Sequence, residues 1–149
     1  MSLPVLMAPA SDVAQLLAEI QQAAAVVGYR HIYGDEVFPR EAVLRRWRSS
    51  SAIAFIADET GFATVSPPLL DALYIRPEAW GTGVAALLYE LAVAELRDQQ
   101  VETAELWVLE KNDRARRFYE RRGWTHHGLT RCAFFPPKPI ELHYTLHLT

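Results

Sequence analysis

Apolar residues recur at helical spacing near the start of the chain, and several share one face: Val13, Leu16, Leu17, Ile20, Ala24 and Val27. This i, i+3, i+4, i+7 spacing is typical of an amphipathic helix. Ser11 and Asp12 are placed to cap its start, and Gly28 is placed to end it. The same spacing predicts a second, shorter helix from Pro39 to Trp47.

Strands are predicted through the middle of the chain, over residues 51–57, 62–65, 70–75 and 103–109. Gly61 lies between the first two strands, which indicates a hairpin. Arg76 ends the third strand, because a residue that precedes proline is restricted to extended geometry. The fourth strand is apolar almost throughout, which indicates that both of its faces are buried.

Two more helices and an alternating tail complete the pattern. Helical spacing resumes from Gly83 through Leu91, and again from the candidate caps Asn112 or Asp113 to Gly123. Residues 142–148 alternate strictly between apolar and polar, as expected of a strand with one buried face. The predicted order is β-α-α-β-β-β-α-β-α-β-β, an α+β fold with helices packed on a sheet.

Length and composition indicate one globular domain over residues 1–149. Half of the residues (50%) are hydrophobic and 22% are charged, which excludes disordered and low-complexity classes. No apolar run approaches the ~20 residues that span a bilayer, and the start lacks the features of a signal peptide. We therefore expect a cytoplasmic protein without a membrane partner. The single cysteine, Cys132, permits neither an internal disulfide nor a cysteine metal cluster.

Charge is unevenly distributed along the chain. Residues 57–110 carry two basic and ten acidic side chains, net −8, whereas residues 111–149 carry eight basic and three acidic, net +5. A basic run spans Lys111, Arg114, Arg116, Arg117, Arg121 and Arg122. The acidic remainder would repel a long polyanion, which argues against nucleic acid as a partner. A small anion or a solvated helix face fits the run better.

A turn with two glycines joins the third strand to the following helix. Leu73–Ile75 end the strand, and Gly81 and Gly83 precede the helix. A helix N-terminus has unpaired N–H groups and a partial positive charge, so glycines there let the backbone approach a phosphate. The alternative is a tight turn that simply requires glycine. A dinucleotide fold and a kinase-type phosphate loop are disfavoured, because a third glycine and a Gly-Lys-Ser/Thr sequence are both missing.

The segment Asn112–Gly123 contains a second group of candidate residues. Asn112 and Tyr119 are seven positions apart, so they project from one side of a helix, about 10 Å apart along its axis. Together with the loop Trp80–Ala85, this segment resembles GNAT-superfamily N-acetyltransferases. Their acyl-CoA loop reads Arg/Gln-x-x-Gly-x-Gly/Ala, and their later strand and helix carry Asn…Phe-Tyr-Glu…Gly-Phe. The predicted element order is similar to that family over nearly the whole chain.

The resemblance implies a mixed, mostly antiparallel sheet of about six to seven strands with about four flanking helices. It also implies acetyl-CoA as acyl donor and no metal. In the family, the strand before the loop pairs through its free backbone with the pantetheine arm. The implied cofactor-binding residues are Leu73, Tyr74, Ile75, Trp80, Gly81, Thr82, Gly83, Val84, Ala85, Asn112, Ala115 and Tyr119. Trp80 departs from the Arg or Gln that is usual at its position.

The same resemblance implies that the Tyr119 phenol is the general acid that protonates the departing thiolate. A backbone N–H of Ile75 or Leu73 would stabilise the developing oxyanion. The general base is open, because Trp107 stands where some family members have glutamate. Asp71 alternates in phase with Leu73 and Ile75, so we expect it to face the groove as a base or as an acceptor-site charge. Other candidates for the base are Glu110, His143 and His147.

The resemblance places acceptor recognition in residues 29–39 and 131–139. The expected substrate-binding residues are Tyr29, Tyr33, Glu36 and Asp71. Aromatic rings with carboxylates suit the amine of a small molecule or a peptide. The sequence leaves monomer and homodimer both open. The alternative function is a non-catalytic acyl-CoA sensor or interaction module with the same fold, which would bind acetyl-CoA without turnover.

Overall fold

Seven strands form one mixed sheet in the computed structural model, which describes residues 3–148. In spatial order they are β1 (Val5–Pro9), β2 (Ile53–Ala57), β3 (Gly61–Ser66), β4 (Leu69–Ile75), β5 (Thr103–Leu109), β7 (Ile140–His147) and β6 (Thr125–Cys132). Neighbouring strands are antiparallel except β4 and β5, which are parallel. The predicted α+β class, with a mixed and mostly antiparallel sheet, is confirmed.

Five α-helices and two 3-10 turns connect the strands: η1 (Ala10–Val13), α1 (Ala14–Gly28), α2 (Arg30–Tyr33), α3 (Arg40–Arg48), η2 (Pro77–Ala79), α4 (Val84–Asp98) and α5 (Asp113–Glu120). The expected start of the first helix at Ser11 or Asp12 is wrong, because both residues lie inside the 3-10 turn and α1 begins at Ala14. The single turn of α2 is too short to produce a periodic pattern. Between residues 3 and 148, none of the helices is long and apolar enough to span a bilayer.

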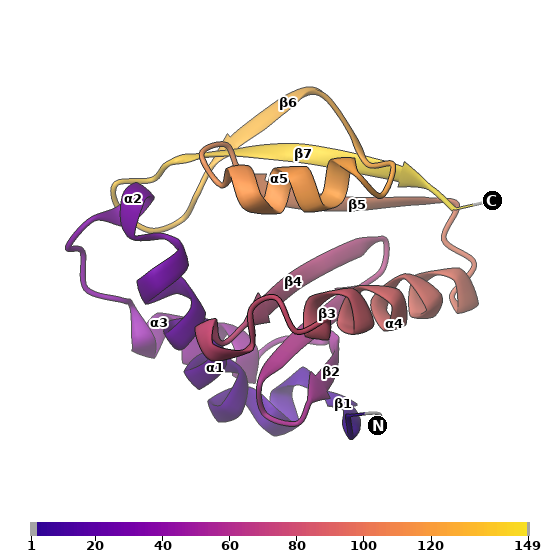
Figure 1. Ribbon diagram of the computed structural model, residues 1–149, viewed down its shortest axis with the longest axis horizontal. Helices are drawn as coiled ribbons and strands as arrows, with labels where there is room; N and C mark the ends of the chain where they lie inside the picture. The colour runs from indigo at the N-terminus through magenta and orange to yellow at the C-terminus, as the bar shows by residue number, and fades with distance from the viewer. Residues whose placement is uncertain (1–2, 149) are drawn as a thin grey trace.

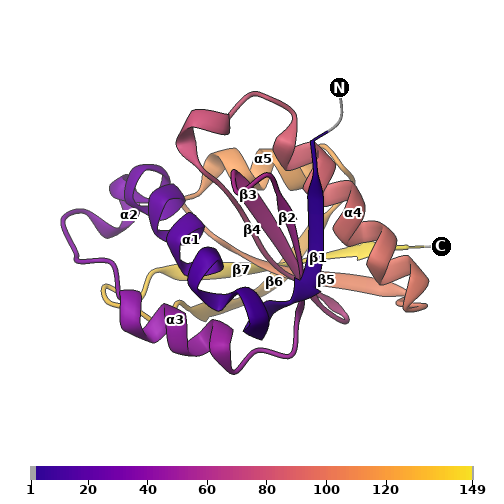
Figure 2. The ribbon, with the colours of Figure 1, turned by 90° about the horizontal axis from the view of Figure 1, so that it is seen from below.

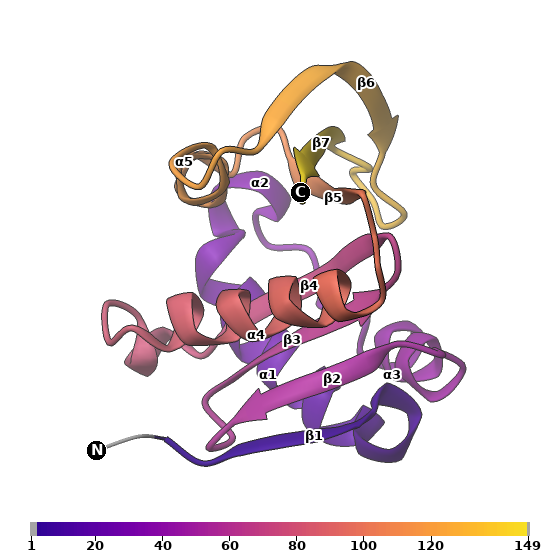
Figure 3. The same cartoon turned by 90° about the vertical axis from the view of Figure 1, so that its right-hand side faces the viewer.

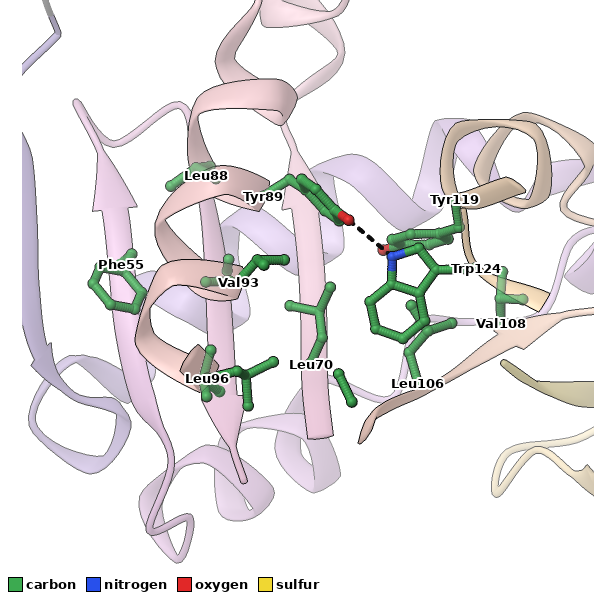
Figure 4. Packing of buried hydrophobic residues seen from close by; sticks show 14 of the residues in the cluster. Phe55, Leu70, Leu88, Tyr89, Val93, Leu96, Leu106, Val108, Tyr119 and Trp124 are labelled. Atoms are coloured by element: carbon green, nitrogen blue, oxygen red, sulfur yellow. Dashed lines mark hydrogen bonds between the residues drawn. The ribbon is translucent and has the colours of Figure 1, made fainter. Parts of the chain in front are cut away.

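The helices cover both faces of the sheet and divide the core into two clusters. Figure 2 shows α1 and α3 on one face, where Leu17, Ile20 and Trp47 are completely buried. On the other face, α4 packs against β3 and β4. There the Nε1–H of Trp124 donates a hydrogen bond of 2.9 Å to the hydroxyl oxygen of Tyr89 (Figure 4). This bond ties α4 to the segment that follows α5.

β4 and β5 pair at one end and then separate. The parallel register consists of Leu69 opposite Glu105. Beyond that pair the two strands diverge, as Figure 1 shows, and Figure 3 shows the strands β1–β4 and the strands β5–β7 as two separate wings. The divergence leaves the end of β4 without a strand partner on the side of β5.

The polar backbone groups at the end of β4 face this opening. The Arg76 N–H donates to the carbonyl of Thr60, beside β3, at 2.7 Å. Because backbone groups alternate in direction along an antiparallel strand, the N–H and C=O groups of Ile75 and Leu73 point away from β3. The edge of β4 is therefore open towards β5, at the place where the family resemblance implies pairing with the pantetheine arm.

A β-bulge interrupts β4 before its open edge. On β3, Thr64 pairs with Ala72 and Val65 pairs with Leu70, so Asp71 is an extra residue without an opposite partner. A bulge changes which face the side chains occupy from that point onward. The simple alternation that the sequence suggests for β4 therefore does not hold through Asp71.

Candidate functional site

A cleft of about 730 Å³ opens where β4 and β5 diverge. Its walls are the C-terminal end of α1, the end of β4 with the loop that follows, and the first turns of α5. The predicted site residues that line it are Tyr29, Leu73, Tyr74, Ile75, Trp80, Gly81, Gly83, Ala85, Asn112, Ala115 and Tyr119. The predicted residues outside the lining are Thr82, Val84, Tyr33, Glu36 and Asp71.

The loop between β4 and α4 forms an open backbone cradle. Gly81 and Gly83 have φ angles of +78° and +91°, a left-handed region that favours glycine. Among residues 3–148, nothing lies within 4 Å of a Cβ built on either glycine. Gly83 is the N-cap of α4, so unpaired N–H groups at the start of this helix adjoin the cleft. The cradle therefore fits a bound anion such as a pyrophosphate.

The side chains of two loop residues make contacts within the protein instead. The Thr82 hydroxyl donates to the carbonyl oxygen of Ala79, and Val84 is 3% exposed. Their side chains fix the loop, so any contact with a bound anion has to come from their backbone. This arrangement explains why both lie outside the cleft lining although their neighbours line it.

Trp80 closes part of the open β4 edge. Its indole Nε1–H donates to the carbonyl oxygen of Ile75 at 2.9 Å. The far end of the ring lies near α1, where a Cβ added to Gly28 would be 3.7 Å from it. The Ile75 carbonyl is thus occupied, while the N–H of Ile75 and the backbone groups of Leu73 still point towards the cleft.

Tyr119 lines the cleft from α5, although the residue is only 8% exposed. Its ring contacts those of Tyr89 and Trp124, as Figure 4 shows. Burial raises the pKa of the Tyr119 phenol well above its ordinary value, and the Tyr74 and Tyr89 phenols raise it further. The hydroxyl is therefore protonated throughout the neutral range, as a proton donor must be.

The turn between β5 and α5 is held in place from two directions. The Asn112 side-chain oxygen accepts the N–H of Ala115 at 3.2 Å, which confirms the predicted N-cap and leaves the amide NH₂ available beside the cleft. On α2, the Nε2 of His31 lies 2.9 Å from the carbonyl oxygen of Lys111. His31 donates when its Nε2 carries the proton, so α2 is linked across the mouth of the cleft to the turn before α5.

Asp71 does not face the groove with Leu73 and Ile75. Its carboxylate accepts from the Arg46 guanidinium at 2.9 Å and from the Thr64 hydroxyl at 3.3 Å. Those partners lie on α3 and on the α3 side of β3, whereas Leu73 and Ile75 pack towards α4. The expected alternation is wrong because the bulge at Asp71 shifts its side chain to the opposite face.

Tyr29 and Tyr74 of the cleft lining lie close to Tyr33 of α2. The ring of Tyr29 lies 6.3 Å from that of Tyr33 and 6.2 Å from that of Tyr74. Burial raises the pKa of Tyr33 to about 12, with smaller contributions from Tyr74 and the carboxylate of Glu141. Sequence reasoning missed Glu141, because only the register of β7 on β5 brings it to this end. Glu36 lies in the exposed loop after α2.

The other candidate bases lie outside the cleft lining. His143 Nε2 is 2.8 Å from a carboxylate oxygen of Glu105, and its ring is 4.9 Å from that of Trp107. Glu110 and His147 are exposed. Asp113, in the first turn of α5, is the only acidic residue among the described residues that line the cleft.

Comparison with known proteins agrees with this geometry. Residues 15–124 match the acetyltransferase (GNAT) family. An uncharacterized N-acetyltransferase of Archaeoglobus fulgidus is 35% identical over an alignment of 72 positions, which covers 46% of this chain and 49% of that protein. The chain thus spans about half the length of the curated relative it matches.

Solved structures share the whole fold at low sequence identity. A GCN5-related N-acetyltransferase from Rhodopseudomonas palustris has a TM-score of 0.80 at 18% identity, covering 99% of this chain and 97% of that one. The PaiA N-acetyltransferase from Thermoplasma acidophilum in complex with coenzyme A has a TM-score of 0.64 at 19% identity, covering 96% and 98%. The family match extends over most of this chain, so the chain belongs to the GNAT acetyltransferase family.

Proposed function

We propose that this protein transfers the acetyl group of acetyl-CoA to the primary amine of a small molecule or peptide, by direct attack in a ternary complex. The observation that carries the proposal is the cleft between β4 and α5, which has the glycine cradle, the open edge of β4 and Tyr119 along its walls. The family match and the coenzyme A complex of a structural relative support the choice of donor.

The donor is held mainly by backbone groups. The Gly81–Ala85 cradle binds the pyrophosphate at the start of α4. The pantetheine amides pair with the open edge of β4 at Leu73 and Ile75, in the manner of an added strand. Since Trp80 already occupies the Ile75 carbonyl, the donor must use the Ile75 N–H and the groups of Leu73. The Asn112 amide, fixed as the α5 cap, contacts the arm from the opposite wall.

Acyl transfer requires a proton for the departing thiolate and stabilisation of the developing oxyanion. Tyr119 supplies the proton, because its phenol is protonated in the neutral range and lines the cleft. The N–H of Ile75 or Leu73 stabilises the oxyanion, because it is fixed within the sheet and directed into the cleft. Both groups are preorganised by the fold, one as the buried residue of α5 and the other in a strand.

Deprotonation of the acceptor falls to water. The Asp71 carboxylate is paired with Arg46 away from the cleft, so we assign it to the support of β4 and α3. The acceptor then reacts as the free amine, and kcat/KM should rise with pH until the amine, with an ordinary pKa near 10, is deprotonated.

The acceptor end favours an amine with an apolar or aromatic body. Its surface is provided by the tyrosines Tyr29, Tyr33 and Tyr74. Two nearby carboxylates are already paired: Asp71 lies 2.9 Å from Arg46, and Glu141 lies 2.7 Å from Arg131. The expected cytoplasmic setting stays a prediction, and monomer and homodimer stay open.

The second candidate function is an acyl-CoA sensor, which the two tryptophans Trp80 and Trp107 at motif positions favour. Calorimetry with acetyl-CoA, together with CoA thiol release over a panel of small amines and peptide N-termini, separates the two functions. An acetyltransferase binds acetyl-CoA and releases CoA only when an acceptor is present. Binding without release over the whole panel would favour the sensor, and no binding would reject both.

A further inference from the structure

Two members of the basic run, Arg116 and Arg122, are engaged in contacts with their own surroundings. The Nε–H of Arg116 donates to the hydroxyl of Tyr144 at 2.9 Å. The guanidinium of Arg122 stacks on Phe118, 3.7 Å from the ring centre. These two arginines therefore act in packing, and a role for the run in ligand binding has to be sought among its other members.

Arg114 differs from them because it reaches across the cleft. Its guanidinium lies 4.3 Å from the centre of the Trp80 ring. Arg114 belongs to the first turn of α5 and Trp80 to the loop between β4 and α4, so the contact joins opposite walls, and both residues line the cleft. The residue is nevertheless exposed to solvent.

The contact with the Trp80 ring holds the guanidinium without using its hydrogen-bond donors. A cation over an aromatic ring is attracted to the face of that ring. The N–H groups of the Arg114 guanidinium therefore remain free for another partner. Trp80 is itself held by its bond to the Ile75 carbonyl. Within residues 3–148, no carboxylate forms an ion pair with Arg114. The result is a positioned cation with open donors.

The position of this cation matches a need of the cradle. Trp80 occupies the loop position where the motif has Arg or Gln, so the loop lacks that polar side chain. Trp80 directly precedes Gly81, the first glycine of the cradle, so a guanidinium on its ring adjoins the place where an anion would bind. We propose that Arg114, held over the ring of Trp80, binds the phosphates of acyl-CoA and replaces the side chain that the loop lacks. This inference rests on the proposed function.

The direct test compares Arg114→Leu with Arg121→Leu by calorimetry. Arg121 lies at the other end of α5, outside the cleft lining, so its substitution removes one charge without touching the cleft. Arg114→Leu should weaken acetyl-CoA binding about tenfold or more, as expected for a hydrogen-bonded charge pair, and Arg121→Leu less than twofold. The difference should shrink at high salt. Equal affinities of the two variants would overturn the proposal, whereas failure of the wild-type protein to bind acetyl-CoA would reject the proposed function itself.

Truncated donors identify the group that is bound. S-acetylpantetheine keeps the acyl arm but has no phosphate. It should therefore bind the wild-type protein and Arg114→Leu with equal affinity. Acetyl-dephospho-CoA keeps the pyrophosphate but lacks the 3′-phosphate. If it retains the full effect of Arg114→Leu, the pyrophosphate is the partner, and if it loses the effect, the 3′-phosphate is. An equal loss for S-acetylpantetheine would mean that Arg114 supports the fold of the cleft, and would contradict the proposal.

Substitutions of Trp80 test the platform. Trp80→Phe keeps an aromatic face and should preserve most of the affinity, whereas Trp80→Leu should approach the loss seen for Arg114→Leu. The double variant Trp80→Leu/Arg114→Leu should bind no more weakly than the worse single variant, because the two residues act as one unit. Trp80→Arg should restore affinity in the Arg114→Leu background. Additive losses with no restoration by arginine would show that the two residues act independently, which contradicts the proposal.

Discussion

Replacement of Tyr119 by phenylalanine isolates the role of a single hydroxyl. The ring is 8% exposed and packs against Tyr89 and Trp124, and phenylalanine keeps those contacts. The hydroxyl belongs to the cleft wall, so its removal should change the free energy of unfolding by less than about 0.5 kcal/mol. Binding of acetyl-CoA, which depends on the cradle and β4, should change little.

The structure also sets the size of the expected rate loss. General acid catalysis contributes about 10²–10⁴-fold. Burial raises the pKa of Tyr119 above its ordinary value, so this phenol is a weaker acid than the thiol that it protonates, whose pKa is about 8.5. Proton transfer from the phenol to the free thiolate is therefore unfavourable, which places Tyr119→Phe at the lower end of the range. We expect kcat to fall about a hundredfold, equivalent to about 2.7 kcal/mol of activation free energy.

The assay is the single-turnover rate of CoA release at saturating acetyl-CoA and acceptor, which reports the chemical step. Tyr89→Phe is the matched control, because its hydroxyl bonds to Trp124 and lies outside the cleft lining. It should lower stability and leave the single-turnover rate unchanged. Retention of more than about half of that rate by Tyr119→Phe would refute its role as general acid and assign proton donation to water.

Three further variants or conditions test other parts of the account. Gly83→Glu places a carboxylate and a Cβ in the open space of the cradle at φ +91°, so acetyl-CoA affinity should fall at least tenfold. Gly83→Gln imposes the same backbone strain without the charge and should lose less affinity. Unchanged affinity in a folded Gly83→Glu protein would reject the cradle. Asp71→Asn removes a partly exposed ion pair with Arg46, so the free energy of unfolding should drop by about 0.5–1 kcal/mol. The kcat and the acetyl-CoA affinity should stay within twofold of the wild-type values, and a large loss of kcat would restore Asp71 as a base. Thermal unfolding against pH tests the buried phenols, because Tyr29, Tyr74 and Tyr119 have raised pKa values and the pKa of Tyr33 is about 12. The phenols ionise first in the unfolded chain, so their contribution to stability is complete below pH 10 and is lost as pH rises from about 10 towards 12 and beyond. A melting temperature that is flat over that window would show that these phenols are solvated in the folded state.

The fold could be predicted from local patterns because the apolar residues within each helix or strand follow the spacing typical of that element. The face of α1 that carries Leu17 and Ile20 is spaced for a helix, and both residues are completely buried. The strict alternation of residues 142–148 likewise appears as buried Leu142 and Tyr144 on β7. Such patterns depend on neighbours a few positions away, so no tertiary information is needed to read them.

The candidate site was predictable where it depends on local conformation. The glycines of the cradle adopt left-handed φ angles that few other residues tolerate, and Asn112 caps the helix that carries Tyr119. Asp71 was misplaced because a single extra residue in β4 reverses the alternation, and a bulge leaves no signature in the pattern of apolar residues.

Other features of the site arise only from tertiary contacts. Arg114 and Trp80 are 34 positions apart in the sequence, yet they meet across the cleft. Glu141 reaches the tyrosines through the pairing of β7 with β5. His31 meets Lys111 through α2, whose single turn has no periodicity. Contacts of this kind depend on how the elements are assembled, which the spacing of residues along the chain does not specify.

The most direct test of the account is a crystal structure of the protein with acetyl-CoA. The account predicts the pyrophosphate over Gly81–Ala85, the pantetheine amides paired with the backbone of Leu73 and Ile75, and the sulfur within hydrogen-bonding distance of the Tyr119 hydroxyl. A donor bound outside the cleft, or a sulfur atom beyond the reach of Tyr119 with the pyrophosphate correctly seated, would contradict it.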